Sequence, residues 1–590
     1  MLLFSNDGAD ICASSTSGPN IIRMAKTATT YAHPTLGRLQ CLTRIPRDNL
    51  LYFHNIPYGK IAQRFARATL VEELPQTFYE VAHDGTDSPP ASIQPLDSGK
   101  MDCKGNQFPK DLMKGYKEDQ SEDCLRLNVI MPDSTTPASA LPVLVFVHGG
   151  AFFIGSSTRP YYEPTTMCEQ ALRHKTPHIF VSMNYRLGGL GFFHSPEAED
   201  LMPANNGLHD QRIGFEWIRR FIGGFGGDVN NITAMGQSAG GMSMTIHNLS
   251  GQENVWKRSI QFSGSLVTMP VKTPDEHHDN FLSQTRKLGL RSNVRSSEQL
   301  AQEMINLPVD KIRDLGYVGQ ACSSSELLPY ESASMVTMSH RQPQSPNFQS
   351  QILSSTTYDG GISYNLMIAN SALKDHAHNF ISIVNDSDLS HPQELLDLYA
   401  ITPSDSDESA LSKICQFESD IGFFAGSLAQ AKGFPGKSYL LLFDLGNPFE
   451  GFLPARECAT HTWDIVALLG SCEDRLDKAY KRVICDFRNK IMEYVFKGEE
   501  PWPAWTEEEG KAMLIGKSGL QVVEKEEYMD QDTRRGKLMA LAQMEGEEHG
   551  ADLLWDGVCR RFLMGKKPEE KPRVTGNACG FGQNSTCTKQ

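Results

Sequence analysis

The chain has 590 residues, of which 39% are hydrophobic and 22% are charged, and its formal net charge is −15. This composition is typical of an ordinary globular protein, and the negative charge argues against nucleic acid or an anionic membrane surface as a partner. A chain of this length has room for about four domains. No Pro/Ser-rich linker or internal repeat divides its middle, however, so we expect one large domain over residues 31–530.

The two ends of the chain differ in character from the middle. Residues 1–30 are small and polar, which predicts a disordered N-terminal arm, and Met24 is an alternative start to Met1. Residues 531–590 are charged, which predicts a helix followed by a flexible tail. No apolar run approaches the ~20 residues of a membrane-spanning helix. The N-terminal residues also lack the apolar stretch that a secretory signal needs. We therefore expect a cytoplasmic protein whose cysteines, thirteen in number, are mainly reduced.

Strand and helix patterns alternate through the middle of the chain. Residues 31–60 hold short strand-like pieces, and residues 80–120, rich in Pro, Asp and Lys, predict a long surface loop. Short apolar runs predict strands at residues 127–131, 142–147, 178–183, 259–262, 351–354 and 438–443. Apolar positions at helical spacing predict a helix over residues 210–222. The alternation indicates an α/β fold with a mostly parallel, doubly wound sheet, beside which residues 275–345 and 370–430 would form a helical cap.

The pentapeptide of residues 236–240 has the pattern Gly-x-Ser-x-Gly. A β-compatible segment precedes it and a small, then apolar segment able to form a helix follows, which is the context of a nucleophile elbow. A serine hydroxyl is a weak nucleophile without an adjacent base. Ser238 is therefore the candidate nucleophile, and the competing interpretation is a plain Gly/Ser loop.

Acyl transfer also needs hydrogen-bond donors for the carbonyl oxygen as it becomes negative. The sequence His148-Gly149-Gly150-Ala151, after a buried strand, resembles the His-Gly-Gly-Gly loop of lipases and esterases. The N–H of Ala239, which follows the candidate nucleophile, would be a second donor. The competing interpretation of the glycine loop is a simple turn at the end of a strand.

The base and the acid are expected in the order serine, acid, histidine along the chain. His461 lies in a short loop after a late strand and is the best candidate for the base, whereas His391 and His549 lie in polar, charged stretches. Asp359 follows a predicted strand and precedes two glycines, so it is the candidate acid. Asp464, three residues after the histidine, is its rival.

Several motifs in a fixed order resemble those of the type-B carboxylesterase family, which includes cholinesterases, bile-salt lipases and fungal esterases and lipases. Within this family, the sequence most resembles the fungal carboxylesterases. The resemblance covers about residues 30–510. Besides the glycine loop and the elbow, it is carried by the segments at residues 121–128, 184–188, 206–212, 225–228 and 261–265.

The resemblance implies an α/β-hydrolase fold and a serine esterase that needs no metal and no organic cofactor. It implies Ser238 as nucleophile, His461 as base and Asp359 as acid. It also implies the roles of seven further residues: oxyanion donors at Gly150, Ala151 and Ala239, a supporting position for Ser263, and structural ion pairs for Arg186, Asp210 and Asp228.

The chain departs from the family pattern at three places. Gln237 stands where many members have glutamate before the nucleophile, Ala151 replaces the third glycine of the oxyanion loop, and no tryptophan lies in the loop before Cys124. The missing tryptophan and the missing charge argue against a choline ester as substrate. Some secreted relatives close this loop with a disulfide, for which Cys103 would be the partner.

The expected function is hydrolysis of a small or medium-sized carboxylic ester through an acyl-enzyme. An acyltransferase or a lactone-processing biosynthetic enzyme would use the same residues, because only the second nucleophile differs. An inactive esterase-like binding protein is the alternative from another class. The sequence leaves the acyl group, the alcohol and the oligomeric state open.

Overall fold

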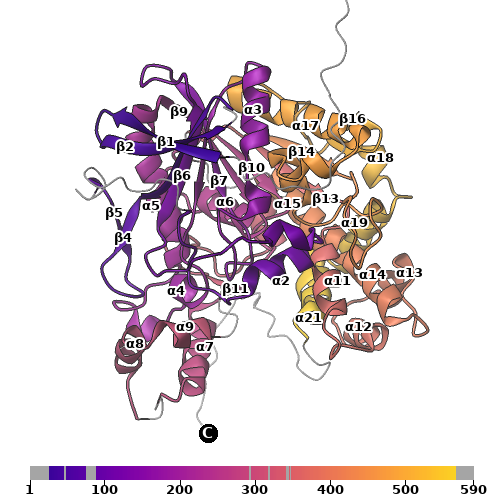
Figure 1. The fold of residues 1–590 in the computed structure, drawn as a ribbon. Coiled ribbons are helices and arrows are strands. Elements are labelled where there is room, and N and C mark those ends of the chain that lie inside the picture. The colour runs from indigo at the N-terminus through magenta and orange to yellow at the C-terminus, as the bar shows by residue number, and fades with distance from the viewer. Residues whose placement is uncertain are drawn as a thin grey trace, which may run out of the picture.

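A twelve-stranded sheet runs through the centre of the molecule (Figure 1). The structure is a computed structural model, and it describes residues 25–45, 48–74, 88–290, 294–315, 319–340, 345 and 347–565. The strand order is β1-β2-β3-β6-β8-β7-β9-β10-β13-β14-β15-β16. The seven consecutive strands from β8 to β15 in this order run parallel to one another. On either side of them the pairs β6–β8 and β15–β16 are antiparallel. The α/β fold with a mostly parallel sheet is thus confirmed.

The strands of the large sheet are β1 (Ala25–His33), β2 (Gly37–Ile45), β3 (Leu50–Pro57), β6 (Arg126–Pro132), β7 (Leu141–Val147), β8 (Ile179–Met183), β9 (Gly227–Gln237), β10 (Arg258–Phe262), β13 (Ser350–Thr356), β14 (Lys437–Phe443), β15 (Ala512–Gly516) and β16 (Gly519–Val523). Two small sheets pair β4 (Gly59–Ile61) with β5 (Ala68–Leu70) and β11 (Val271–Lys272) with β12 (Ala321–Cys322).

The α-helices are α2 (Ser98–Gly105), α3 (Thr165–Arg173), α4 (Gly188–Phe192), α5 (Asn206–Phe221), α6 (Ala239–Leu249), α7 (Pro274–Lys287), α8 (Ser297–Ile305), α9 (Val309–Arg313), α10 (Met335–Ser339), α11 (Gly361–Ile368), α12 (His376–Asn385), α13 (Pro392–Leu398), α14 (Asp407–Glu418), α15 (Ala425–Gly433), α16 (Trp463–Leu469), α17 (Lys478–Lys497), α18 (Lys525–Met529), α19 (Arg534–Glu545), α20 (Gly550–Asp552) and α21 (Arg560–Leu563). The short 3₁₀ helices are η1 (Lys110–Met113), η2 (Pro160–Tyr162), η3 (Pro196–Ala198), η4 (Ile222–Phe225) and η6 (Glu473–Arg475), and two π-helices are η5 (Ser419–Phe424) and η7 (Leu553–Cys559).

The central strands are buried on both faces, which explains their continuous apolar sequences. In β7, every residue after Leu141 is buried. Alternate residues of this strand belong to two different core clusters, Val145 to one and Phe146 to the other, so helices cover both faces of the sheet. The parallel arrangement places the carboxyl ends of β7, β9, β13 and β14 along one edge. In such sheets a ligand site is expected at that edge.

Four expectations about the elements need correction. The segment of residues 80–120 is not only a loop, because it contains α2 and η1. The strand β1 begins at Ala25, so the N-terminal arm would end before residue 25, and residues 1–24 lie outside the described part. The predicted helix at residues 210–222 begins earlier, at Asn206. The segment after residue 530 folds into several short helices, and the tail beyond residue 565 is outside the described residues.

The helices expected as one cap form two groups. Figure 1 shows α7, α8 and α9 together at the bottom of the view and α11 to α14 together at the right. The first group packs around Phe281, Leu300 and Ile312 in a separate core cluster, which it shares with residues of neighbouring segments. The second group shares the main cluster with the C-terminal helices, to which Phe380 and Phe562 contribute. The C-terminal helices are therefore part of the packed structure.

Three other expectations can be compared with the structure. Arg186 and Asp210 form a buried ion pair, with Nη2 and Oδ1 2.7 Å apart. Asp228 has no ion-pair partner among the described residues, and its side chain accepts the backbone N–H of Asn230 instead. Cys103 and Cys124 are both buried free thiols and do not form the disulfide considered above. Within the described part of the chain, no helix combines the length and the apolarity needed to cross a membrane.

Candidate active site

Ser238 lies at a sharp turn between β9 and α6, as expected for a nucleophile elbow. Its backbone has φ 55° and ψ −121°, a strained conformation for a non-glycine residue. The glycines on either side make the turn possible, because a Cβ at Gly236 would lie 2.2 Å from the carbonyl oxygen of Gly240, and one at Gly240 would lie 2.1 Å from that of Val147. Ser238 is only half-buried, although its neighbours are fully buried.

The glycine loop after β7 lies directly against the elbow. A Cβ at Gly149 would be 2.9 Å from the Cβ of Ser238, so only glycine allows this approach. Gly150 has φ 103°, and a Cβ there would lie 2.0 Å from the carbonyl oxygen of Ile154. Ala151 also has a positive φ of 56°. Ala239 is the first residue of α6, so its N–H has no acceptor within the helix. The structure thus places Gly149, at the start of the loop that carries Gly150 and Ala151, against Ser238.

His461 and Asp359 form a buried hydrogen bond. The Nδ1 atom of His461 lies 2.8 Å from Oδ1 of Asp359, and their side chains are 5% and 0% exposed. The two loops are joined beside this contact, because Tyr358 donates its backbone N–H to the carbonyl of Ala459 at 3.1 Å. The second carboxylate oxygen of Asp359 accepts the N–H of Thr356 at 2.9 Å. This carboxylate therefore holds the imidazole in one orientation.

The other nitrogen of His461 contacts Gln237, the residue before the candidate nucleophile. The two Nε2 atoms are 3.1 Å apart, and the amide nitrogen of Gln237 also donates to Oγ1 of Thr462 at 2.8 Å. Tyr162 donates to the amide oxygen of Gln237 at 3.3 Å. Among the described residues, Ser238 Oγ has no hydrogen bond to His461. The residue before Ser238 thus contacts His461, and catalytic hydrogen bonds are often incomplete before substrate binds.

Asp464, the rival acid, contacts serines rather than the histidine. Its Oδ2 accepts Oγ–H bonds from Ser354 at 3.1 Å and from Ser263 at 3.5 Å, and its Oδ1 accepts the N–H of Ile465 at 2.8 Å. The hydroxyl of Ser263 therefore contacts Asp464 and has no hydrogen bond to His461 among the described residues. Burial and, secondarily, the neighbouring Asp359 raise the pKa of Asp464 to about 7.

Glu418 is a further buried carboxyl group near the histidine that the sequence analysis did not identify. It is the last residue of α14 and accepts a hydrogen bond from Ser363 at 2.8 Å, while its Oε2 has no partner among the described residues. Burial raises its pKa to about 7, and His461 and Asp359 are close enough to shift it further, in opposite directions. No local pattern in the sequence marks this residue, because its relation to the site arises from contacts between distant segments.

Three other histidines that the sequence analysis named have no hydrogen bond to Asp359 among the described residues. His391 lies 3.1 Å from Glu545 on the surface of the helical group. His549 precedes α20. His148, in the glycine loop, has its Nδ1 2.8 Å from the carbonyl of Gly149, and burial lowers the pKa of this histidine to about 4. Its role is therefore to hold the loop as a neutral side chain.

The raised pKa values of the two buried carboxyl groups predict how stability depends on pH. Between about pH 4 and 7 each carboxyl group is more protonated in the folded chain than in the unfolded chain. The free energy of unfolding therefore falls as pH rises through this window. We expect Asp464→Asn to gain stability relative to wild type from pH 4 to 8, by up to about 4 kcal/mol. Chemical denaturation across this range measures the difference.

Glu418→Gln is the matched second variant, and the same trend is expected because its pKa is raised for the same reason. A difference in unfolding free energy that stays constant over the whole pH range would contradict the prediction for either variant.

Comparisons with known proteins match the chain to one family model and to several known proteins. The family model described as "Carboxylesterase family" matches residues 34–531. The para-nitrobenzyl esterase of Bacillus subtilis is 40% identical over 165 residues, which cover 27% of this chain and 32% of that protein. Lipase 5 of Diutina rugosa is 38% identical over 160 residues, which cover 27% of this chain and 29% of that protein. The aligned segments thus span about a third of the lengths of these relatives.

The fold comparison extends much further along the chain. A solved structure of a PNB esterase superposes with a TM-score of 0.65 over 85% of this chain and 98% of the other, at 20% sequence identity. Its similarity therefore supports the architecture of the sheet and its helices, and at this identity it shows the fold alone.

Proposed function

Because the chain belongs to the carboxylesterase family, we propose that it hydrolyses small-molecule carboxylic esters with Ser238 as nucleophile, His461 as base and Asp359 as the residue that orients the base. One observation carries the proposal: the buried 2.8 Å hydrogen bond between Asp359 and His461 lies beside a serine at a strained elbow. Neither partner of that bond has another charged side chain as its hydrogen-bond partner within the described chain.

The first half of the reaction is acylation. The amide of Gln237 turns away from His461, whose Nε2 then accepts the proton of Ser238 as Oγ forms a bond to the ester carbonyl carbon. Backbone N–H groups of Gly150, Ala151 and Ala239 stabilise the negative oxygen. The protonated histidine returns its proton to the leaving alkoxide oxygen, and the alcohol departs from the acyl-enzyme. Asp359 stabilises the imidazolium throughout.

The second half of the reaction uses the same groups. A water molecule gives a proton to His461 while its oxygen attacks the acyl carbon, and the oxyanion donors again stabilise the charge. The Ser238 oxygen takes the proton back as the carboxylic acid leaves. An alcohol in place of water would give acyl transfer, so the second nucleophile alone separates hydrolysis from the acyltransferase alternative.

A rapid-quench experiment tests the proposed function. Purified protein is mixed with p-nitrophenyl esters from acetyl to palmitoyl, quenched with acid, digested and analysed by mass spectrometry. We expect release of p-nitrophenol and an acyl group on the peptide that contains Ser238, because the acyl-enzyme is an obligatory intermediate. An acyl group on another residue, or turnover without any acyl-enzyme, would contradict the assignment. A parallel reaction with added alcohol detects transfer to a second acceptor.

A further inference from the structure

A buried glutamine, Gln94, holds one end of the loop that carries the proposed oxyanion donors. The residue is 2% exposed. Its amide oxygen accepts the backbone N–H of Gly155 at 2.8 Å, and its amide nitrogen donates to the carbonyl of the same glycine at 2.9 Å. Buried backbone groups need hydrogen-bond partners. One side chain therefore satisfies both polar groups of Gly155 and fixes the position of this residue.

Gly155 closes the turn in which the proposed donors lie. The turn begins at Gly150, whose carbonyl accepts the backbone N–H of Ile154 at 2.9 Å. Gly155 then packs against the residue before the turn, because a Cβ at Gly155 would lie 2.5 Å from the carbonyl oxygen of Gly149. Gly150 and Ala151 lie between these contacts. A shift of Gly155 therefore displaces the backbone that carries their N–H groups.

Arg159 in turn fixes the amide of Gln94. Its side chain is completely buried, and its Nη2 donates to the amide oxygen of Gln94 at 3.0 Å. Two carboxylates hold the same guanidinium, with Nη1 2.6 Å from Oδ2 of Asp102 and Nε 2.9 Å from Oε1 of Glu118. A guanidinium bound on two sides has a fixed orientation. Buried hydrogen bonds thus run without a break from these carboxylates through Arg159 and Gln94 to the donor loop.

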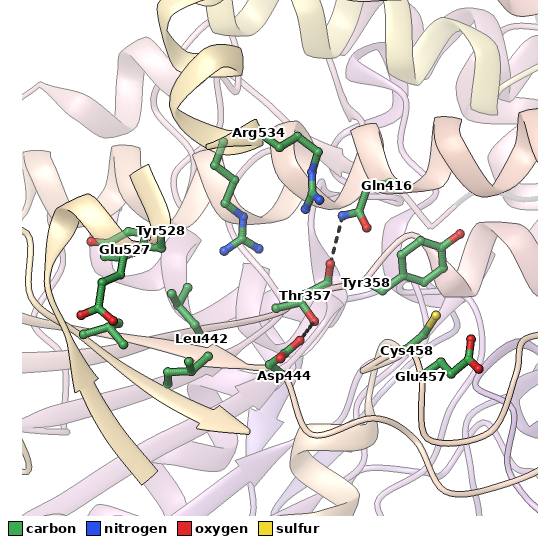
Figure 2. Close-up of a pocket in the computed structure, with 13 residues that line it drawn as sticks. Thr357, Tyr358, Gln416, Leu442, Asp444, Glu457, Cys458, Glu527, Tyr528 and Arg534 are labelled. Atoms are coloured by element: carbon green, nitrogen blue, oxygen red, sulfur yellow. Dashed lines mark hydrogen bonds between the residues drawn. The ribbon is translucent and has the colours of Figure 1, made fainter. Parts of the chain in front are cut away.

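The loop of the proposed acid has separate supports. Figure 2 shows Gln416, on α14, donating to the carbonyl of Thr357 at 3.1 Å, while the hydroxyl of Thr357 donates to Asp444 at 2.6 Å. Thr357 stands two residues before Asp359 in the chain. Within the described ranges, no hydrogen bond of Gln94 reaches any of the three proposed triad residues. Gln94 therefore acts on the donor loop and not on the triad.

We propose that Gln94 is a positioning residue for the oxyanion donors of the ester hydrolysis proposed above, on which this inference rests. Fixed N–H groups stabilise a developing oxyanion because they need no reorganisation when the charge appears. A displacement of about 1 Å costs up to about 100-fold in rate. Both half-reactions pass through an oxyanion, so loss of the Gln94 amide lowers kcat with little change in KM.

Kinetics and inhibition of full-length Gln94→Met test this role. Methionine has about the same length as glutamine but no amide, so both polar groups of Gly155 lose their partner. We expect kcat for the best p-nitrophenyl ester to fall about 10- to 100-fold. The inhibition constant of an alkyl trifluoromethyl ketone should rise by a similar factor. The Ser238 oxygen adds to the carbonyl carbon of this inhibitor, its proton passes to His461, and the negative oxygen that results needs the same donors. Active-site titration corrects kcat for unfolded protein, and the inhibition constant needs no such correction.

Gln170→Met is the matched control. Gln170 is also 2% exposed, and its amide oxygen accepts a hydrogen bond from a buried arginine, Arg488. Its amide nitrogen donates to the carbonyl of Cys485 at 2.9 Å, so these contacts join α3 to α17. Removing this amide should lower stability as in Gln94→Met and leave kcat and the inhibition constant unchanged.

If Gln94→Met does not fold, Gln94→Glu replaces it, because a carboxylate still accepts the N–H of Gly155 but cannot donate to its carbonyl. The same directions of change in kcat and in the inhibition constant are expected. Unchanged values of both in the Gln94 variant, or an equal change in Gln170→Met, would overturn the proposal. A wild-type protein that turns over no ester would overturn the proposed function and this inference together, whereas an active wild type with an equally active Gln94 variant would overturn this inference alone.

Discussion

Replacing Ser238 with alanine is expected to lower kcat/KM for p-nitrophenyl esters by about 10³- to 10⁶-fold. The change removes the oxygen that forms the acyl-enzyme and leaves the elbow, the glycine loop and the histidine in place. Alanine has the same backbone preferences at φ 55° as a serine without side-chain hydrogen bonds, so folding should be retained. Steady-state kinetics of both proteins on the best ester of the series measure the effect.

Ser263→Ala is the matched control for this prediction. Ser263 also has a positive φ, of 48°, and its hydroxyl contacts Asp464 rather than the reacting atoms. We expect a far smaller loss than for Ser238→Ala. Turnover of Ser238→Ala at the wild-type rate would refute the assignment of the nucleophile. A wild-type protein inactive on every ester would instead favour a narrow biosynthetic substrate or an inactive scaffold.

Asp359→Asn is expected to lower kcat by about 10⁴-fold. The carboxylate accepts the Nδ1–H of His461, which leaves Nε2 free to accept a proton. An asparagine amide can donate to Nδ1 instead, which favours the tautomer of His461 with its proton on Nε2. In that tautomer Nε2 cannot accept the proton of Ser238. The pH dependence of kcat/KM for the variant would show whether activity recovers at high pH, where Ser238 needs less help from a base.

Asp464→Asn is the control that separates the two carboxylates near the histidine. Asp464 contacts Ser354 and Ser263, with no hydrogen bond to His461 in the described structure. A much smaller loss of kcat is therefore expected for this variant than for Asp359→Asn. A larger loss for Asp464→Asn would show that the orienting acid had been assigned to the wrong residue.

Much of the candidate site could be predicted because its parts are local in sequence. The elbow at Ser238 needs glycines two residues away on each side, since a Cβ at either position would overlap the backbone. The glycine loop needs Gly149 and Gly150 for the same reason. The strands around them are short apolar runs because both faces of the sheet are buried. Such short-range steric and burial requirements are written directly in the amino-acid pattern.

The sequence favoured Asp359 as the acid but left Asp464 as a rival. Asp359 is 102 residues from His461, whereas Asp464 is three residues away, and both are aspartates beside predicted elements. The pairing of β13 with β14 brings the Asp359 loop to the histidine, and the bridge between Tyr358 and Thr460 fixes the approach. The contact of Gln237 with His461, 224 residues apart, has the same origin.

The sequence by itself determined the α/β class, the elbow and the glycine loop, because each depends on patterns within single strands, helices or turns. Only the tertiary structure decided which acid faces the histidine, that Glu418 is buried near it, and that Gln94 binds Gly155. The last contact joins residues 61 positions apart. Burial and charge pairing of this kind depend on how distant segments pack, and no local pattern records them.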